Sequence, residues 1–344
     1  MSGSEESGAG GSQTLGELGE AGVLKDIFAT LTTTDSVLVG PGDDTALLAV
    51  SGPVLATTDA MVRGRDWLDE WSSAHDVGVK VVMQNLADLA AMGGVGTGLL
   101  VTLIAPGALP ARWARDLTAG IAEISAATGV PVIGGDLSSS DGAVAVSVTA
   151  LGEVPGGRAV LRSGAEPGQE VAVSGSLGRS AAGLEVLRRS GTDGSPSGRH
   201  TGLGAGPGAG PAAGWVAYHR RPDPDLSQGP AAAAAGATAM LDVSDGLVRD
   251  GGRIATASTV RIDLDEAAIG ALAEEFVSEL GSAPALDCVL TGGEEHSLLA
   301  TFPVGTVPPG WTVVGHTAEA GTAGPGVWWR GERTTGGGWD HFGG

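Results

Sequence analysis

The sequence of 344 residues contains a single cysteine, Cys288, so no disulfide can form within the chain. Its neighbours Leu286, Val289 and Leu290 are apolar, which predicts a buried strand and a core thiol rather than a reactive one. No stretch reaches the roughly 20 apolar residues that a membrane-spanning helix needs. Residues 1–13 lack the basic and apolar regions of a targeting signal, which predicts a disordered leader on a cytoplasmic protein.

Basic residues are also scarce. The chain has 19 Lys and Arg against 40 Asp and Glu, which gives a formal net charge of −21. Such a charge repels a phosphodiester backbone and an anionic membrane surface, so neither nucleic acid nor a membrane is an expected partner. An acidic protein can still bind anionic metabolites where divalent metal ions lie between its carboxylates and the ligand's phosphates.

Two common phosphate-handling motifs are absent. A Walker A loop needs Gly-Lys, and the two lysines, Lys25 and Lys80, follow Leu and Val. The His-Arg-Asp element of protein kinases is missing, and the six histidines lack the spacing of zinc proteases. Any phosphate chemistry in this chain must therefore rely on aspartates and metal ions.

Apolar residues make up 42% of the chain, which is enough to fill two cores of ordinary size. In the first half, short apolar runs alternate with patterns of helical period. The expected elements are strands at 37–39, 54–56 and 99–104 and helices at 74–92 and 109–128. This alternation predicts a mixed α/β domain over 14–155.

The remaining residues, 156–344, predict a second α/β domain. Its expected elements are a strand at 170–174, a helix at 179–189, and a strand at 239–243 that leads into another helix. Between them, 190–214 consists almost entirely of Gly, Ser, Pro and Ala, which predicts a flexible surface loop. Its glycines lack the spacing of a nucleotide-binding loop.

Aspartates stand at the ends of expected strands, in three short segments rich in glycine or threonine. These segments are Gly42-Asp43-Asp44, Thr57-Thr58-Asp59 and Gly134-Gly135-Asp136. Carboxylate and hydroxyl oxygens are hard ligands that suit Mg²⁺, and glycines let a phosphate approach the backbone closely. Alternation along a strand would place Thr57 and Asp59 on the same face.

Two further elements carry aspartates. On the helix expected over 74–92, Asp88 shares a face with Lys80, away from the apolar stripe, so its side chain can point into a cleft. In Asp242-Val243-Ser244-Asp245-Gly246 a strand turns into a helix, where free N–H groups favour a metal-bound phosphate and two aspartates can share a metal. Taken singly, each aspartate is equally typical of a turn or a helix cap.

Taken in order, these segments resemble the thiamine-monophosphate kinases, which belong to the aminoimidazole ribonucleotide synthetase-like superfamily. The resemblance spans about 14–342, and the matching segments are 16–20, 42–44, 57–59, 85–93, 134–136, 162–165, 242–247 and 292–294. It implies a two-domain α/β fold, in which the N-terminal domain dimerises through its sheet and the active site lies between the domains. Selenophosphate synthetases and a hydrogenase maturation protein share the superfamily, but Cys288 fits the cysteine of neither.

The resemblance also implies roles for individual residues. The implied magnesium ligands are Asp44, Thr57, Thr58, Asp59, Asp88, Asp136, Asp242 and Asp245, of which Asp88, Asp136 and Asp245 are catalytic. The implied ATP contacts are Gly135, Arg162 and Ser244, and the implied substrate contacts are Asp66, Glu294 and Trp339. An aromatic ring such as that of Trp339 suits the cationic thiazolium of thiamine.

The implied reaction is direct in-line transfer of the ATP γ-phosphoryl group to thiamine monophosphate by a homodimer that binds several Mg²⁺ ions. A phosphate monoester has a second pKa of about 6, so the attacking oxygen needs no general base at neutral pH. Two departures from the family pattern affect the acceptor site: Asp66 replaces a histidine, and Glu295 replaces an aspartate. They motivate an alternative, a non-catalytic or altered-specificity protein that binds nucleotide or thiamine phosphate.

Overall fold

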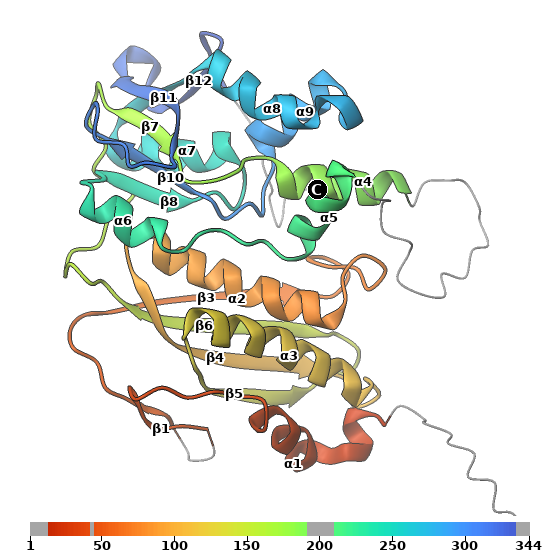
Figure 1. The fold of residues 1–344 in the computed structure, drawn as a ribbon. Helices are drawn as coiled ribbons and strands as arrows, with labels where there is room; N and C mark the ends of the chain where they lie inside the picture. Colours follow the sequence, from red (N-terminus) through yellow and green to blue (C-terminus); the bar gives the residue numbers. More distant parts are fainter. Residues whose placement is uncertain (1–12, 42–44, 191–209, 335–344) are drawn as a thin grey trace, which may run out of the picture.

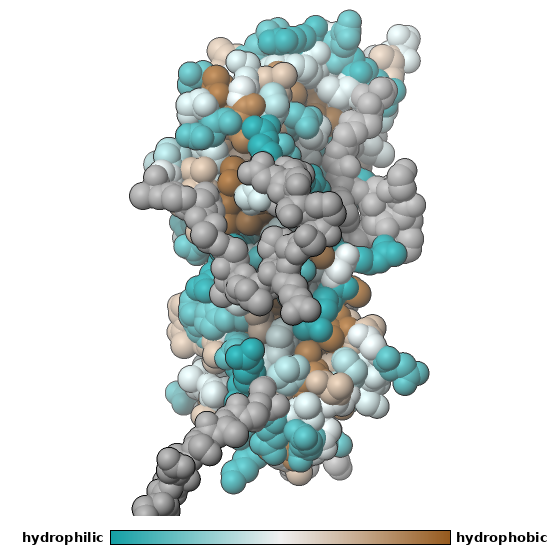
Figure 2. Space-filling model, turned by 90° about the vertical axis from the view of Figure 1, so that its right-hand side faces the viewer, coloured by the Kyte–Doolittle hydropathy of each residue, from teal (hydrophilic) through white to brown (hydrophobic). Residues whose placement is uncertain are grey.

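The computed structural model describes residues 13–41, 45–190 and 210–334. These residues form two main β-sheets, which lie one above the other with helices between and around them (Figure 1). Figure 2 shows the same two lobes from the side. Among the helices of the described ranges, none combines the length and the apolar composition needed to cross a membrane.

The first sheet has four strands in the order β3-β6-β4-β5. These strands are β3 (Val54–Val62), β4 (Val95–Ala105), β5 (Val132–Ser139) and β6 (Ala145–Glu153). β6 is antiparallel to both its neighbours, whereas β4 and β5 are parallel. Two helices, α2 (Ala74–Ala91) and α3 (Ala111–Thr128), lie against one face (Figure 1). A small sheet of β1 (Val37–Val39) and β2 (Leu47–Leu48) and the helix α1 (Leu15–Phe28) precede these elements.

The other face of the four-stranded sheet is open. Side chains alternate along each strand, so Thr57 and Asp59 face α2 whereas Thr58 points the opposite way. On the opposite side, four apolar side chains are at least 37% exposed: Val54, Val95, Leu100 and Ile104. We refer to the side that these four residues mark as the open face.

The second sheet has seven strands in the order β13-β12-β9-β11-β7-β10-β8. They are β7 (Glu170–Val173), β8 (Ala239–Asp242), β9 (Val260–Leu264), β10 (Leu298–Phe302), β11 (Thr312–Glu319), β12 (Gly326–Trp329) and β13 (Glu332–Arg333). Alternate residues of its strands face α7 (Leu247–Ser258), α8 (Glu266–Leu280) and α9 (Ser282–Thr291). The helices α4 (Arg179–Ser190), α5 (Pro211–Arg220) and α6 (Gln228–Ala234) complete this half, and Gly321–Ala323 forms a short 3₁₀ turn.

Helix α2 packs against both halves of the molecule and so joins them. It is therefore buried on nearly every side. Its residues Leu86 and Leu89 pack in the core of the first sheet, whereas Ala90 and Ala91 pack against the second sheet and α6. The helix begins with a capping box, in which Ser73 and Asp76 each accept a hydrogen bond from the other's backbone N–H.

Several expected elements are confirmed, but others need correction. Cys288 is buried, yet it lies in helix α9 rather than in a strand, since a short apolar run does not distinguish the two. Asp59 and Asp136 do not follow their strands but lie within them, because β3 and β5 are both longer than expected.

The expected loop at 190–214 is wrong at its end, where 211–214 forms the first turn of α5 with Pro211 at a helix start that tolerates proline. The stretch 191–209 and most of the leader, 1–12, lie outside the described residues. The division into domains near residue 155 stays a prediction.

The close crossing of α2 and α3 generates a stability prediction. A Cβ atom on Gly120 would lie 2.1 Å from the carbonyl oxygen of His75. Gly120→Ala is therefore expected to destabilise the protein by about 2 kcal/mol or more, through overpacking that exceeds the helix-propensity gain. Chemical denaturation measures the change. Gly270→Ala is the matched control, because a Cβ at this exposed helix position meets nothing within 4 Å and should stabilise.

Candidate functional site

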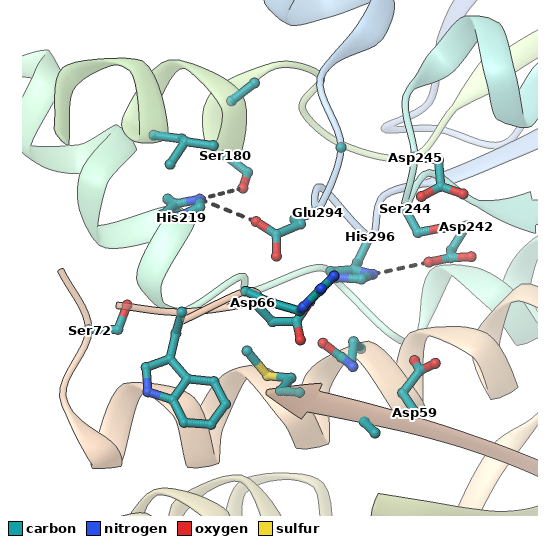
Figure 3. Close-up of a pocket in the computed structure, with 18 of the residues that line it drawn as sticks. Asp59, Asp66, Ser72, Ser180, His219, Asp242, Ser244, Asp245, Glu294 and His296 are labelled. Carbon is teal, nitrogen blue, oxygen red and sulfur yellow. Dashed lines mark hydrogen bonds and ion pairs between the residues drawn. The ribbon is translucent and has the colours of Figure 1, made fainter. Parts of the chain in front are cut away.

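A pocket of about 650 Å³ lies between the two sheets. Its lining comes from β3 and the turn after it, from α2, α4, α5 and α7, from the segment between β6 and β7, and from the two loops that follow β8 and precede β10 (Figure 3). Eight of the residues predicted from the sequence line this pocket: Asp59, Asp66, Asp88, Arg162, Asp242, Ser244, Asp245 and Glu294. The fold thus gathers side chains that are almost 240 positions apart in the sequence.

The carboxylate of Asp88 has a strongly raised pKa. Thr57 Oγ1 donates a hydrogen bond of 2.7 Å to Asp88 Oδ2. Burial raises the pKa of Asp88 to about 7, and the negative charges of Asp242 and Asp59 contribute to the increase. Three carboxylates from two sheets and a helix are therefore close enough to repel one another, and a bound cation would relieve that repulsion.

The carboxylate of Asp242 at the end of β8 contacts His296. His296 Nδ1 lies 3.0 Å from Asp242 Oδ2, and this contact is drawn in Figure 3. Burial alone would lower the pKa of His296, but its hydrogen bond and ion pair with Asp242 raise it. The other ring nitrogen, Nε2, is buried and has no hydrogen-bond partner in the described part of the chain.

Asp245 lies just before α7 and pairs with Arg253 of that helix. The same guanidinium pairs with Asp250, whose side chain is fully buried and whose Oδ2 accepts a hydrogen bond of 2.8 Å from the Asp245 backbone N–H. Burial raises the pKa of Asp250 to about 6. The backbone N–H of Asp245 itself is therefore not a free donor at this turn.

Glu294 belongs to a buried polar network at the other end of the pocket. Lys80 Nζ lies 2.7 Å from Glu294 Oε1, and His219 Nδ1 lies 3.5 Å from Oε2. Burial would raise the pKa of Glu294, but Lys80 and His219 lower it. Burial, with help from Lys80, lowers the pKa of His219 to about 3, so this histidine is neutral at physiological pH.

Comparisons with known proteins find a family model and relatives that match this chain. Residues 42–154 match the family model described as AIR synthase related protein, N-terminal domain. A thiamine-monophosphate kinase of Mycobacterium tuberculosis is 40% identical over 337 residues, covering 96% of this chain and 94% of the relative.

The chain belongs to the thiamine-monophosphate kinase family.

Two solved structures of this family share the fold. The thiamine-monophosphate kinase of Stenotrophomonas maltophilia has a TM-score of 0.76 and 29% identity, covering 91% of this chain and 96% of that one. The protein AaThiL in complex with AMPPCP and TMP has a TM-score of 0.70 and 29% identity, covering 95% of this chain and 98% of that one. The resemblance and the two-domain α/β fold class expected from the sequence are thereby confirmed.

Three residues that the family resemblance assigns to the site lie elsewhere on the four-stranded sheet. Thr58 lies on the open face, where its hydroxyl donates to the Val148 carbonyl. Gly135 and Asp136 lie on β5, at the sheet edge opposite β3. Asp59 and Gly135 lie in the same row across the sheet, three strand spacings apart, which is a distance of about 14 Å. Asp44 and Trp339 lie outside the described residues.

Glu295, which departs from the family pattern, does not face the pocket. Its buried carboxylate accepts hydrogen bonds from Ser176 Oγ at 2.6 Å and from the Ser180 backbone N–H at 3.0 Å. Ser180 lies in the first turn of α4, so Glu295 satisfies a free donor at the start of that helix. The extra methylene of Glu295 therefore affects the position of α4 and does not act directly on a ligand.

Several pocket residues were missed by the sequence reasoning, among them His219, Arg253, His296 and Trp71. Arg253 could have been found, because Arg249 and Arg253 lie one turn apart on the helix that the sequence predicts after Asp245 and so face the same side. His296 and Trp71 carry no comparable signal, since each depends on a loop conformation. The pocket thus contains an aromatic ring, Trp71, that the described residues supply without Trp339.

The perturbed pKa of Asp88 predicts a pH-dependent stability difference. The folded-state pKa of about 7 lies above the ordinary value of 3.8. The contribution of the protonated carboxyl to the free energy of unfolding is therefore complete below about pH 4 and is lost as the pH rises through 7. Asp88→Asn cannot ionise and retains an acceptor for Thr57. The metal-free variant should exceed the parent in stability at about pH 8 by at most about 4 kcal/mol, and by less at about pH 5.5.

Thermal unfolding in a chelator measures this difference at both pH values. Asp116→Asn is the control, because Asp116 is an exposed aspartate of α3 and the variant measures the effect of the same substitution far from the pocket. A stability gain for Asp88→Asn that does not grow with pH contradicts the burial and repulsion described above.

Proposed function

We propose that this chain transfers the γ-phosphoryl group of ATP to thiamine monophosphate, giving thiamine diphosphate and ADP, as a cytoplasmic homodimer. Family membership supports the reaction, and AaThiL binds AMPPCP together with TMP. The observation that carries the proposal is the pocket, in which carboxylates from both halves face a common space lined by Arg65, Arg162, Arg188 and Arg253. Phosphoryl transfer needs such a site, because two polyanions must meet there.

Magnesium fits the donors that line this pocket. Asp59, Asp88, Asp242 and Asp245 offer the hard carboxylate oxygens that Mg²⁺ prefers, and burial together with the charges of Asp242 and Asp59 raises the pKa of Asp88. Bound Mg²⁺ would neutralise phosphate charge and orient the two substrates. Within the described ranges no three His, Cys, Asp or Glu side chains form a ready metal-binding group. Instead Asp88, Asp242 and Asp245 each contact a protein partner.

The protein's own groups would hold the substrates and would not abstract a proton. The acceptor phosphate is largely deprotonated at neutral pH, with a second pKa of about 6. The guanidinium of Arg162 suits a nucleotide phosphate, as does the backbone around Ser244. For the thiamine portion we propose Glu294, which is part of the lining, and the ring face of Trp71, which suits a cationic thiazolium. Trp339 stays a prediction for the same role.

Asp66 would act on the acceptor through the turn that follows β3. Its Oδ2 accepts a hydrogen bond of 2.7 Å from the Val62 backbone N–H, which fixes that turn. The turn carries Arg65 into the pocket lining. An arginine beside Asp66 offsets the negative charge that this residue brings in place of the family's histidine. This arrangement favours the kinase over the alternative of a non-catalytic binding protein.

The direct test is to incubate the protein with Mg-ATP and thiamine monophosphate and to follow thiamine diphosphate and ADP by chromatography. Asp245→Asn is the matched inactive variant, and we expect its turnover to fall by at least about 1,000-fold, since an electrostatic contact to transferring phosphate typically contributes at this scale. Asp263→Asn, on the distant strand β9, is the control for the substitution itself. Magnesium-dependent AMPPCP binding without any product would instead identify a binding protein.

The open face supports a homodimer. A sheet whose second face carries exposed Leu100, Ile104, Val54 and Val95 is an unusual surface for a monomer, and a two-fold dimer would bury it against its own copy. Such a dimer would also explain the position of Asp136. This residue lies on the open face and at the far edge of its own sheet, where it can approach the β3 edge of a partner.

The dimer proposal predicts complementation between inactive variants. If Asp136 serves the pocket of the partner subunit, both Asp88→Asn and Asp136→Asn should be inactive alone. Co-expressed together, mixed dimers would contain one complete site, and about a quarter of all sites should be active in a random mixture. If Asp136 serves its own subunit's pocket, no site is complete and the mixture stays inactive. The measurement is thiamine diphosphate formation per dimer.

A further inference from the structure

Arg253 occupies a position that no role assigned above accounts for. It lies in α7, lines the pocket, and has a side chain that is 35% exposed. Its Nη1 donates to Asp250 Oδ1 and its Nη2 donates to Asp245 Oδ2. One guanidinium therefore joins a fully buried carboxylate to a carboxylate that we propose as a magnesium ligand.

The two hydrogen bonds of Arg253 differ in how readily a ligand can replace them. Asp250 is 0% exposed, and its other oxygen already binds the Asp245 backbone, so the Nη1 contact belongs to the folded framework of α7. Asp245 is 18% exposed at its side chain and faces the pocket. Only the Nη2 contact can therefore be exchanged for a ligand without unfolding this helix start.

Charge makes that exchange necessary once a metal binds. A guanidinium on an oxygen of Asp245 competes with Mg²⁺ for the same carboxylate and repels the incoming cation. A phosphate that arrives with the metal brings oxygens that suit a planar guanidinium fork. The pocket that Arg253 lines is the space in which such phosphates would lie.

We propose that Arg253 is a displaceable counter-ion: it holds Asp245 in the metal-free protein, and it pairs through Nη2 with a phosphate oxygen of the bound ligand once Mg²⁺ takes Asp245. Asp250 keeps the guanidinium in place through Nη1 in both states. This inference rests on the proposed function, because it uses Asp245 as a metal ligand. It adds a phosphate-binding residue that the family resemblance did not indicate.

Arg249 provides the matched control. It lies one turn earlier on α7, and its Nε is 3.9 Å from the same Asp245 Oδ2, but it does not line the pocket. Removing its charge therefore tests for a general electrostatic effect on Asp245. Arg253→Lys keeps a cation for Asp250 but loses the fork that reaches two partners.

The experiment measures binding by calorimetry for Mg²⁺ alone, for Mg-AMPPCP and for thiamine monophosphate with Mg²⁺. For Arg253→Gln we expect Mg²⁺ alone to bind more tightly, by about threefold or more, because its competitor is gone. We expect Mg-AMPPCP, thiamine monophosphate or both to bind about tenfold more weakly, because a charge-assisted hydrogen bond is lost. Which ligand weakens identifies whether the nucleotide or the acceptor supplies the phosphate.

These opposite changes separate the proposal from a purely structural role. If Arg253 has only a structural role, Arg253→Gln should have a lower unfolding temperature. Its affinities for Mg²⁺ and for the phosphate ligands should then change in the same direction or not at all, and that result would overturn the inference. Arg253→Lys guards against a folding defect and should lie between the parent and Arg253→Gln. Arg249→Gln should change each affinity by less than about twofold.

Turnover of the parent protein distinguishes this inference from the proposed function. If the parent forms thiamine diphosphate but Arg253→Gln shows no opposite changes, the counter-ion proposal fails and the function stands. If the parent forms no product but the opposite changes appear, the phosphate contact stands and the reaction is wrong.

Discussion

Repulsion between carboxylates is the constraint on which this site depends. Asp59, Asp88 and Asp242 come from a strand of one sheet, the helix between the sheets and a strand of the other, yet the charges of Asp242 and Asp59 add to the burial that raises the pKa of Asp88. Folding alone does not favour such an arrangement, because like charges in a partly buried space oppose it. His296, which contacts Asp242, offsets part of this repulsion at Asp88, and we propose that a metal ion offsets the remainder. A site with surplus negative charge can then accept two polyanions once that metal is bound.

Helix α2 makes this arrangement possible. It is buried between the sheets, and its close approach to α3 is set by Gly78 and Gly120, where a Cβ would lie within about 2.2 Å of a facing carbonyl oxygen. Its position presents Asp88 to the end of the pocket where we propose metal binding and Lys80 to Glu294 at the other end. Its first turn is tied to α5 by the ion pair between Asp76 and Arg221. One rigid element therefore sets the spacing between both substrate regions.

Sequence reasoning predicted those parts of the site that depend on local geometry. The helical period placed Asp88 on the polar side of α2, and the strand-to-helix turn placed Asp242 and Asp245 together. It could not predict the strand order β3-β6-β4-β5, which separates Asp136 from Asp59 although both were expected at the ends of strands. It also could not show that Glu295 turns away to the start of α4, since the direction of a loop side chain depends on tertiary contacts. The helix around Cys288 was misassigned because an apolar run of five residues fits either period.

The most direct measurement is a crystal structure of this chain with AMPPCP, Mg²⁺ and thiamine monophosphate. The account predicts Mg²⁺ bound by oxygens of Asp88, Asp242 and Asp245 at about 2.1 Å, with both phosphate groups in the pocket between the sheets and Arg253 turned from Asp245 to a phosphate oxygen. A structure in which the nucleotide lies elsewhere, or in which these carboxylates keep their present protein partners with no metal between them and the phosphates, would contradict it.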